Sequence, residues 1–175
     1  VHLFGQAVDM SRLMKIANKH GLYVIEDNAQ AIGANVSYLG EKKKTGTIGH
    51  IGCTSFFPSK NLGCFGDGGA IFTNDNGLAE KIRMIINHGS KVKYFHEVVG
   101  VNSRLDTIQA AILRIKLKKL DEYIHKRKKV ADFYDSKFNN INGLNIPNRV
   151  SWSEHVFHQY TMIVKDQRDK LRNHL

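Results

Sequence analysis

The chain has 175 residues, of which 42% are hydrophobic and 24% are charged. These are the proportions of an ordinary globular protein, and the length suits one domain with a real core but is short for two. No apolar stretch approaches membrane-spanning length and the first residues do not form a signal peptide, so we expect no membrane partner. The chain starts on Val1–Gly5 and stops within a helical pattern at Asp169–Leu175, so we expect an internal piece of a longer protein.

The net charge is +10, from 26 Lys and Arg against 16 Asp and Glu. Much of the excess lies in one stretch, whose basic residues are Arg114, Lys116, Lys118, Lys119, Lys126, Arg127, Lys128 and Lys129. A basic helix can bind nucleic acid or an anionic surface. The same region shows no pattern of interleaved aromatic residues or helix-turn-helix spacing that would support binding along a nucleic acid, and it carries apolar residues at helical spacing, namely Leu105, Ile108, Ile112 and Ile115. We therefore interpret the lysines as the solvated face of a helix and expect no nucleic-acid partner.

The two cysteines, Cys53 and Cys64, are too few and too oddly spaced for a disulfide framework or a zinc site, so we expect no metal. Cys53 lies in an apolar run, which predicts a buried reduced thiol. A reducing cytoplasm fits this use of cysteine best.

The first half of the chain alternates helical and strand patterns. A helix is predicted from Asp9 or Ser11 to a stop at Gly21, with an apolar face formed by Met10, Leu13, Met14 and Ala17. Strands buried in a sheet are predicted at 22–26, 51–57 and 69–73, and a polar hairpin or loop at 38–47. A second helix, capped by Asn74 or Asp75 and closed by Gly89, carries Leu78, Ile82 and Ile85. Alternation of this kind predicts an α/β sheet covered by helices.

The second half begins with a polar loop over 90–102. A single long helix is predicted from about Leu105 to about Asn139, which exceeds the usual length of a globular helix and indicates a connection between two packed units. Strands are predicted at 144–147 and 156–164. These elements divide the chain into a first unit at 1–104, a connecting helix at 105–140 and the start of a second domain at 141–175.

Lys60 is the residue on which the functional interpretation depends. It lies between the predicted strand 51–57 and the glycine-rich run Gly66–Gly69. Desolvation disfavours an ammonium ion, and a neutral amine can attack a carbonyl. A surface lysine that extends to water is the alternative.

Other polar groups accompany Lys60. Asp27 follows the predicted strand 22–26, and in an open α/β sheet ligands bind beyond the carboxyl ends of strands. A cap for a short helix starting at Asn28 is the alternative for Asp27. Gln30 lies three residues further on, and Ser55 lies near the end of the strand 51–57. An amine for a carbonyl, a hydroxyl for a phosphate and a carboxylate for a ring nitrogen are the groups that pyridoxal phosphate needs.

The chain resembles the central part of the DegT/DnrJ/EryC1/StrS family of sugar aminotransferases. The resemblance lies in motifs that run from the first residue to about Tyr134, namely Val1–Gln6, Val24–Ala31, Thr54–Gly63, Gly66–Ala70, Asn87–Gly89, Gly100–Asp106 and Gln109–Leu113. It implies part of the α/β large domain of the fold type I, aspartate aminotransferase-like transferases that depend on pyridoxal 5'-phosphate, followed by the start of a small C-terminal α+β domain.

By this resemblance Lys60 is the Schiff-base lysine and Asp27 the partner of the pyridine nitrogen. Gln30 lies near the phenolic oxygen and Ser55 binds the phosphate. Asn102 reaches the phosphate of the neighbouring subunit, which implies a homodimer. Arg104 helps to organise that shared site or forms a structural salt bridge. His2, Tyr94 and His96 contact substrate or cofactor, or they serve packing and loop anchoring, which we prefer.

The implied reaction moves an amino group, with glutamate as donor, to a keto nucleotide-sugar. Members that dehydrate sugars have histidine in place of the lysine, so Lys60 favours transamination. The segments Tyr94–Gly100 and Ser153–Tyr160 are similar to members that aminate C3 of dTDP-linked keto-deoxyhexoses. Family members also carry a glycine-rich phosphate turn and a stacking aromatic before the first motif, so we expect this chain alone to bind the cofactor weakly or not at all. A non-catalytic or regulatory relative, and a basic binder of nucleic acid or an anionic surface, are the alternative functions.

Overall fold

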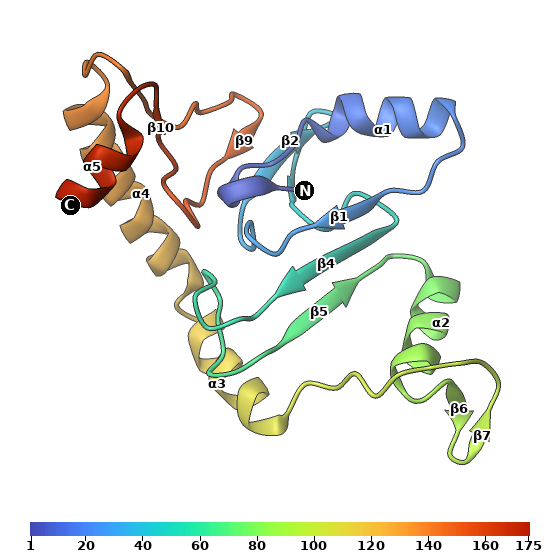
Figure 1. Cartoon of the computed structure of the whole chain (residues 1–175). Helices are drawn as coiled ribbons and strands as arrows, with labels where there is room; N and C mark the ends of the chain where they lie inside the picture. Colours follow the sequence, from blue (N-terminus) through green and yellow to red (C-terminus); the bar gives the residue numbers. More distant parts are fainter.

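The computed structural model describes residues 1–175 and has a three-stranded sheet at its centre (Figure 1). The strand order is β1–β4–β5, formed by β1 (Ile25–Asp27), β4 (Ile51–Ser55) and β5 (Gly69–Phe72). β1 and β4 are parallel, with Asp27 opposite Cys53, and β5 runs antiparallel to β4. The expected α/β sheet is therefore present.

The first helix forms as predicted. α1 (Met10–Lys19) begins after Asp9, whose side chain accepts a hydrogen bond from the Arg12 backbone N–H at 3.1 Å. Gly21, at φ +62°, follows the end of the helix in the left-handed region that glycine adopts freely. The apolar face packs in one buried cluster, made of Ala7, Met10, Met14 and Val36.

The strand β1 differs from the prediction in place and in burial. It begins at Ile25 and includes Asp27, and only Glu26 is buried, whereas Ile25 is 64% exposed. The face of β1 that carries Glu26 is covered by the loop that follows the hairpin of β2 (Asn35–Tyr38) and β3 (Glu41–Lys44). The expectation of a strand buried on both faces is therefore wrong for this chain, because nothing in it covers the second face.

The helix that follows β5 also begins where the sequence predicts. α2 (Asn76–Ile86) begins after Asp75, whose side chain accepts from the Leu78 N–H at 2.9 Å, as one of the two predicted caps. The region expected to be a polar loop contains a small hairpin, β6 (Ser90–Val92) and β7 (Phe95–His96), which extends beside α2 (Figure 1).

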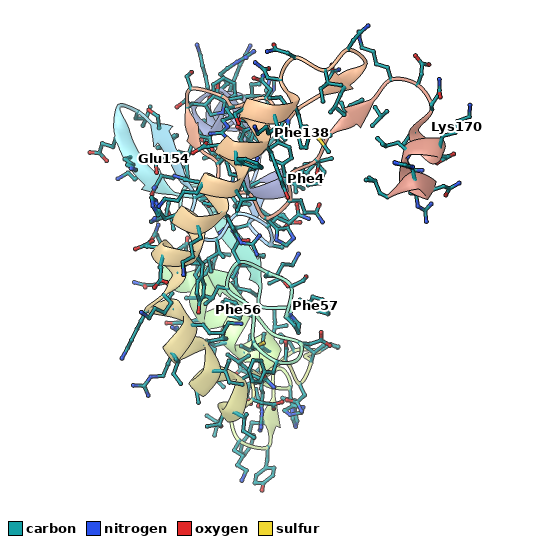
Figure 2. The ribbon with its side chains drawn as sticks, turned by 90° about the vertical axis from the view of Figure 1, so that its left-hand side faces the viewer. Phe4, Phe56, Phe57, Phe138, Glu154 and Lys170 are labelled. Carbon is teal, nitrogen blue, oxygen red and sulfur yellow. The ribbon has the colours of Figure 1, made fainter.

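The long helix is split in two, so the expectation of one continuous helix is wrong. α3 (Thr107–Leu117) and α4 (Leu120–Phe138) meet at Lys118–Lys119, where the Lys119 N–H donates to the carbonyl of Lys116 at 2.9 Å and the i→i−4 series is interrupted. No Gly or Pro marks this break. The two helices run along one side of the molecule (Figure 2).

The buried face of α3 matches the prediction only in part, because Leu105 packs against the core cluster and Ile112 is partly buried, but Ile108 and Ile115 are not. Ile108 and Ile115 are 73% and 71% exposed. The helix instead packs through Leu113 and through Gln109, whose side-chain oxygen accepts from the Phe65 N–H at 2.8 Å. These residues lie four positions apart, so they share a face. α3 and α4 contribute to the larger core cluster, formed by Ala31, Ala34, Phe56, Leu62, Cys64, Leu113, Leu120, Ile124 and Val156.

The C-terminal part holds short elements: β8 (Leu144–Asn145), β9 (Ser153–Glu154), β10 (Ile163–Val164) and α5 (Arg168–His174), of which α5, marked by Lys170 in Figure 2, lies apart from α4. The strand predicted at 156–164 is wrong except for β10. Phe157 has φ +47°, and the Val156 N–H donates to the carbonyl of Gly5 at 2.9 Å, so this segment docks on the N-terminal residues instead of extending. None of the helices is both long and apolar enough to cross a bilayer.

Candidate active site

Two of the predicted site residues end neighbouring parallel strands. Asp27 is the last residue of β1 and Ser55 the last of β4, so both lie at the same edge of the sheet (Figure 1). Asp27 is exposed, and its Oδ1 accepts from the Ala29 N–H at 3.0 Å. No helix starts at Asn28, so the capping interpretation of Asp27 is wrong, and the carboxylate only closes a local turn.

The carboxylate of Asp27 lies on the same side of the sheet as the thiol of Cys53. Burial, and after it the negative charge of Asp27, raises the pKa of this thiol and keeps it protonated. Cys53 is only partly buried, which corrects the sequence expectation. Cys64 is the fully buried cysteine, and its sulfur hydrogen-bonds to the carbonyl oxygen of Phe56 at 3.0 Å.

Lys60 lies on a tight turn that follows β4. Its backbone N–H donates to the carbonyl of Phe57 at 2.9 Å, and the Phe57 N–H in turn donates to the hydroxyl of Ser55 at 3.2 Å. A Cβ on Gly63 would lie 2.5 Å from the carbonyl oxygen of Pro58, so the chain passes too close to itself at Gly63 to allow a side chain there. Lys60 is therefore placed directly beyond the strand that carries Ser55, on a hydrogen-bonded turn.

Lys60 is half-buried and lines a cavity of about 720 Å³ between its own turn, α4 and the segment 157–160. Basic side chains are prominent in the lining, namely Lys60, Lys116, Lys126, Arg127 and His158. The aromatic members are Tyr123, Tyr134, Phe157 and Tyr160. Part of the basic stretch thus faces a cavity instead of forming only a solvated face. The lining suits an anionic ligand that carries a ring.

His158 is a member of this cavity that the sequence did not single out as a site residue. Burial lowers its pKa, and the nearby cations of Lys60 and Arg127 lower it further. Its Nδ1 is buried without a hydrogen-bond partner. Such an atom usually has a partner, so a ligand group or water is the expected occupant beside it.

Gln30 lies on the turn after β1 and is tied to the N-terminal segment. Its Oε1 accepts from the Phe4 N–H at 2.6 Å. The acceptor atom of this amide is thus already used, and its NH₂ group is the one that remains to donate.

The other predicted residues are not brought to Lys60 within this chain. Asn102 pairs with Asn87 in an isolated bridge, and Arg104 is exposed and lines a separate cavity of about 1110 Å³ between β5 and α2. Tyr94 is 80% exposed on the β6–β7 hairpin, where the Nδ1 of His96 lies 2.8 Å from the carbonyl oxygen of His88. The hairpin and the Lys60 turn lie at opposite ends of the sheet (Figure 1).

No group of three His, Cys, Asp or Glu side chains is placed to hold a metal ion.

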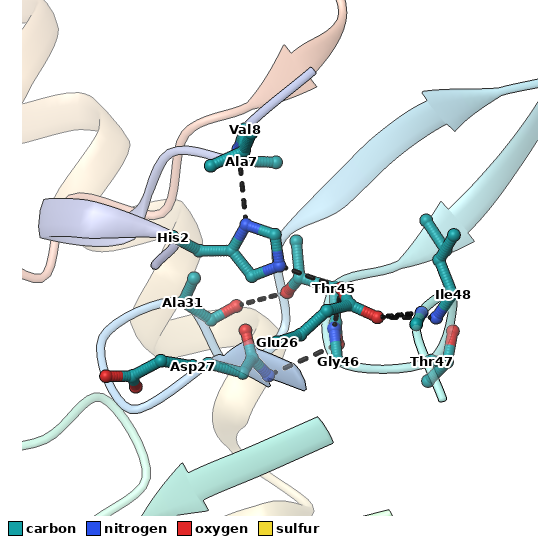
Figure 3. Close-up of polar contacts among 12 residues, drawn as sticks. His2, Ala7, Val8, Glu26, Asp27, Ala31, Thr45, Gly46, Thr47 and Ile48 are labelled. Atoms are coloured by element: carbon teal, nitrogen blue, oxygen red, sulfur yellow. Dashed lines mark hydrogen bonds and ion pairs between the residues drawn. The ribbon is translucent and has the colours of Figure 1, made fainter. Parts of the chain in front are cut away.

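The buried carboxylate of Glu26, next to Asp27, is hydrogen-bonded to His2 at 2.8 Å (Figure 3). The sequence did not indicate this contact, because 24 residues separate the two.

A model of the DegT/DnrJ/EryC1/StrS aminotransferase family matches residues 1–175. The chain belongs to this family. The family resemblance and the fold type I assignment made from the sequence are confirmed.

Similar proteins include a "Pleiotropic regulatory protein" of Geobacillus stearothermophilus, 51% identical over 98% of the chain and 45% of that protein. A dTDP-3-amino-3,4,6-trideoxy-alpha-D-glucose transaminase of Streptomyces venezuelae is 45% identical over the whole chain and 45% of its own length. Among solved structures, S. venezuelae DesV in complex with a ketimine intermediate has a TM-score of 0.92 at 44% identity, covering 99% of this chain and 45% of that one. The chain thus spans slightly less than half the length of the relatives it matches.

Proposed function

We propose that the protein is a pyridoxal phosphate-dependent aminotransferase that acts on a keto nucleotide-sugar in amino-sugar biosynthesis. The observation that carries the proposal is the position of Lys60, half-buried on a hydrogen-bonded turn beyond the parallel strands that end in Asp27 and Ser55. Family membership supports the class of reaction.

The residues at the strand ends fit the cofactor. Pyridoxal phosphate, when bound, supplies an electron sink for the bond broken at the substrate's Cα. The Lys60 amine would hold the cofactor's carbonyl carbon and then, once released, move a proton as general base and acid. The Asp27 carboxylate is exposed and makes only one local contact, so it is available to a protonated ring nitrogen. The Ser55 hydroxyl would bind the phosphate, and the free NH₂ of Gln30 would donate to the phenolic oxygen.

The substrate class rests on the basic cavity beside Lys60. A nucleotide-sugar brings a diphosphate, which suits the cations of Lys116, Lys126 and Arg127, and a base and sugar ring, which suit the aromatic side chains. The names of the relatives include transaminases of dTDP- and UDP-linked sugars. We propose glutamate as the amino donor and, on the resemblance of Tyr94–Gly100 and Ser153–Tyr160, a dTDP-linked keto-deoxyhexose as substrate.

The assembly is part of the proposal. Asn102 pairs with Asn87 at the end of α2 and does not line the Lys60 cavity, so a phosphate contact from Asn102 would serve the site of a second copy in a homodimer. Arg104 would support that shared site, with Tyr94 and His96 near the substrate. We further propose a cytoplasmic location and the division into a large-domain part at 1–104, a connection at 105–140 and the start of a small domain at 141–175.

A regulatory role without turnover is the second candidate. The observation that favours it is the 51% identity with the protein of Geobacillus stearothermophilus that is named a pleiotropic regulatory protein. A site that binds cofactor but does not turn over would fit that role. Binding of nucleic acid by the basic stretch is weaker, because three of its cations line the Lys60 cavity.

The test is to express the complete reading frame and to follow cofactor absorbance with glutamate and a panel of dTDP- and UDP-linked keto sugars. The expected result is a visible Schiff-base band that glutamate removes and one keto sugar restores. Lys60→Ala abolishes the band, whereas Lys118→Ala, at an exposed lysine, keeps it. A band that persists in Lys60→Ala would contradict the assignment of the lysine. A band without turnover on any sugar would favour the regulatory role.

A further inference from the structure

Glu26 is a buried carboxylate with every hydrogen-bonding direction in use. It is 3% exposed, and its Oε1 accepts from the N–H groups of Ile48 at 2.7 Å and Gly49 at 2.5 Å. Its Oε2 accepts from the Gly46 N–H at 2.8 Å and from the Nε2 of His2 at 2.8 Å (Figure 3). Burial alone would raise the pKa of Glu26, but the hydrogen bonds from His2, Gly49, Gly46 and Ile48 outweigh it and hold the pKa below its ordinary value. The side chain is therefore an anion inside the fold.

His2 is fully buried and joins Glu26 to the backbone of Asp27. Its Nδ1 accepts from the Val8 N–H at 3.2 Å, so the proton that faces Glu26 is on Nε2. The contact is thus a hydrogen bond from a neutral imidazole to a carboxylate. The backbone N–H of His2 also donates to the carbonyl oxygen of Asp27 at 3.0 Å. One residue holds both the Glu26 side chain and the Asp27 main chain.

The residue on the other side of Asp27 is held by the same loop. Asn28 is buried, and its Nδ2 donates to the carbonyl of Thr45 at 3.2 Å, while its backbone N–H donates to the carbonyl of Cys53 at 2.7 Å. The two neighbours of Asp27 are therefore anchored in loop 45–49. Successive side chains of a strand point to opposite faces, so Asp27 must point away from that loop. Figure 3 shows its carboxylate directed away from Glu26 and His2.

We propose that Glu26 and His2 form a positioning pair for Asp27, fixing the height and direction of its carboxylate against the ring nitrogen of the cofactor. The inference rests on the proposed function, since it needs Asp27 to be the partner of that nitrogen. Asp27 has only the turn contact with Ala29 of its own, so it depends on its neighbours for its placement. A displaced Asp27 would weaken the contact with the ring nitrogen but leave the other cofactor contacts in place.

The experiment compares two cofactors in the complete protein: pyridoxal phosphate, and its analogue in which carbon replaces the ring nitrogen. The analogue cannot use Asp27, so the ratio of the two dissociation constants reports on the Asp27 contact alone. The variants are Glu26→Gln, which places an NH₂ group against backbone N–H donors, and His2→Asn, which can keep the Val8 contact but not the one to Glu26. The control is Glu41→Gln, at an exposed carboxylate. Asp27→Asn calibrates the full loss, and the unfolding temperature of each cofactor-free variant is recorded.

In the wild type the natural cofactor should bind more tightly than the analogue, and Asp27→Asn should remove the preference. Glu26→Gln and His2→Asn should each reduce the preference by about fivefold, the size of one net hydrogen bond, while Glu41→Gln leaves it unchanged. If the variants weaken both cofactors equally, or only lower the unfolding temperature, the pair is merely structural and the inference is overturned. If Glu26→Gln does not fold, His2→Asn decides the question. A wild type that shows no preference, or an Asp27→Asn variant that keeps it, contradicts the proposed role of Asp27 itself.

Discussion

Gly33 offers a sharp test of how the turn carrying Gln30 is fitted against α4. It has φ +87°, and a Cβ built on it would lie 2.5 Å from the Cδ1 of Ile124. Gly33→Ala should therefore cost two separate amounts: about 1–2 kcal/mol for an L-residue in left-handed backbone, and about 1–3 kcal/mol for overpacking. We expect a total loss of about 2–5 kcal/mol in the free energy of unfolding.

Two matched variants separate these contributions. Gly143 has φ +81°, and nothing lies within 4 Å of the position that a Cβ would take there, so Gly143→Ala should show the backbone cost alone. Ile124→Val removes the Cδ1 atom and by itself should cost about 0.5–1.5 kcal/mol. In the double variant the steric part should disappear, so the combined loss should be smaller than the sum of the two single losses by about 1 kcal/mol or more.

The assay is urea unfolding of the complete protein, followed by far-ultraviolet circular dichroism, with wild type and the four variants compared at one pH. The slope of the free energy of unfolding against urea concentration should be the same for all variants, so that the urea midpoint reports stability. Strict additivity of Gly33→Ala and Ile124→Val would refute the contact. So would equal losses in Gly33→Ala and Gly143→Ala.

Three further predictions follow from the polar groups. The pKa of Glu26 lies below its ordinary value of 4.5, so the stability that its carboxylate contributes is present above pH 4.5 and is lost as the pH falls through the folded pKa. Urea midpoints measured from pH 6 to 2 test this prediction, and Glu26→Gln should lose this part of the acid dependence. Burial, and after it the cation of Arg149, lowers the pKa of His155 from 6.5 to about 4. The free energy of unfolding should therefore fall by on the order of 3 kcal/mol as the pH drops from 6.5 to 4, and His155→Gln should remove this pH dependence. If the variant keeps the same pH dependence, His155 is not its source. Asp75→Ala removes the acceptor for the Leu78 N–H and should cost about 1 kcal/mol in urea unfolding, whereas Asp75→Asn, which keeps an acceptor, should cost less.

Local chemistry in the sequence was enough to predict several elements and the order of the site residues. Asp9 and Asp75 are caps because a carboxylate next to an apolar helical pattern satisfies free N–H groups in any fold. The polar, glycine-containing run at 38–47 predicted a hairpin or loop, and the hairpin of β2 and β3 turns within it at Gly40, whose φ is +81°. Asp27, Ser55 and Lys60 could be placed at strand ends because each follows a short apolar run, and parallel strands end at one edge.

Other features depended on contacts between distant residues. Periodicity predicted an apolar face that includes Ile108 and Ile115, whereas the contacts of Gln109 with Phe65 and of Leu113 with the core decided which face of α3 is buried. The segment 156–164 has strand composition, but its main chain is held by Gly5, so it does not extend. The break at Lys118–Lys119 has no local marker, since neither Gly nor Pro occurs there.

What the sequence by itself determined is the inventory of the candidate site: an amine, a carboxylate, an amide and a hydroxyl, in a fixed order and next to strands. What only the tertiary structure decided is their surroundings. The Lys60 cavity is lined by Arg127 and His158, and the Glu26 carboxylate beside Asp27 is held by His2, so these partners come from distant parts of the chain. Hydrogen bonds and burial act between neighbours in space, and a pattern along the chain specifies only neighbours in sequence.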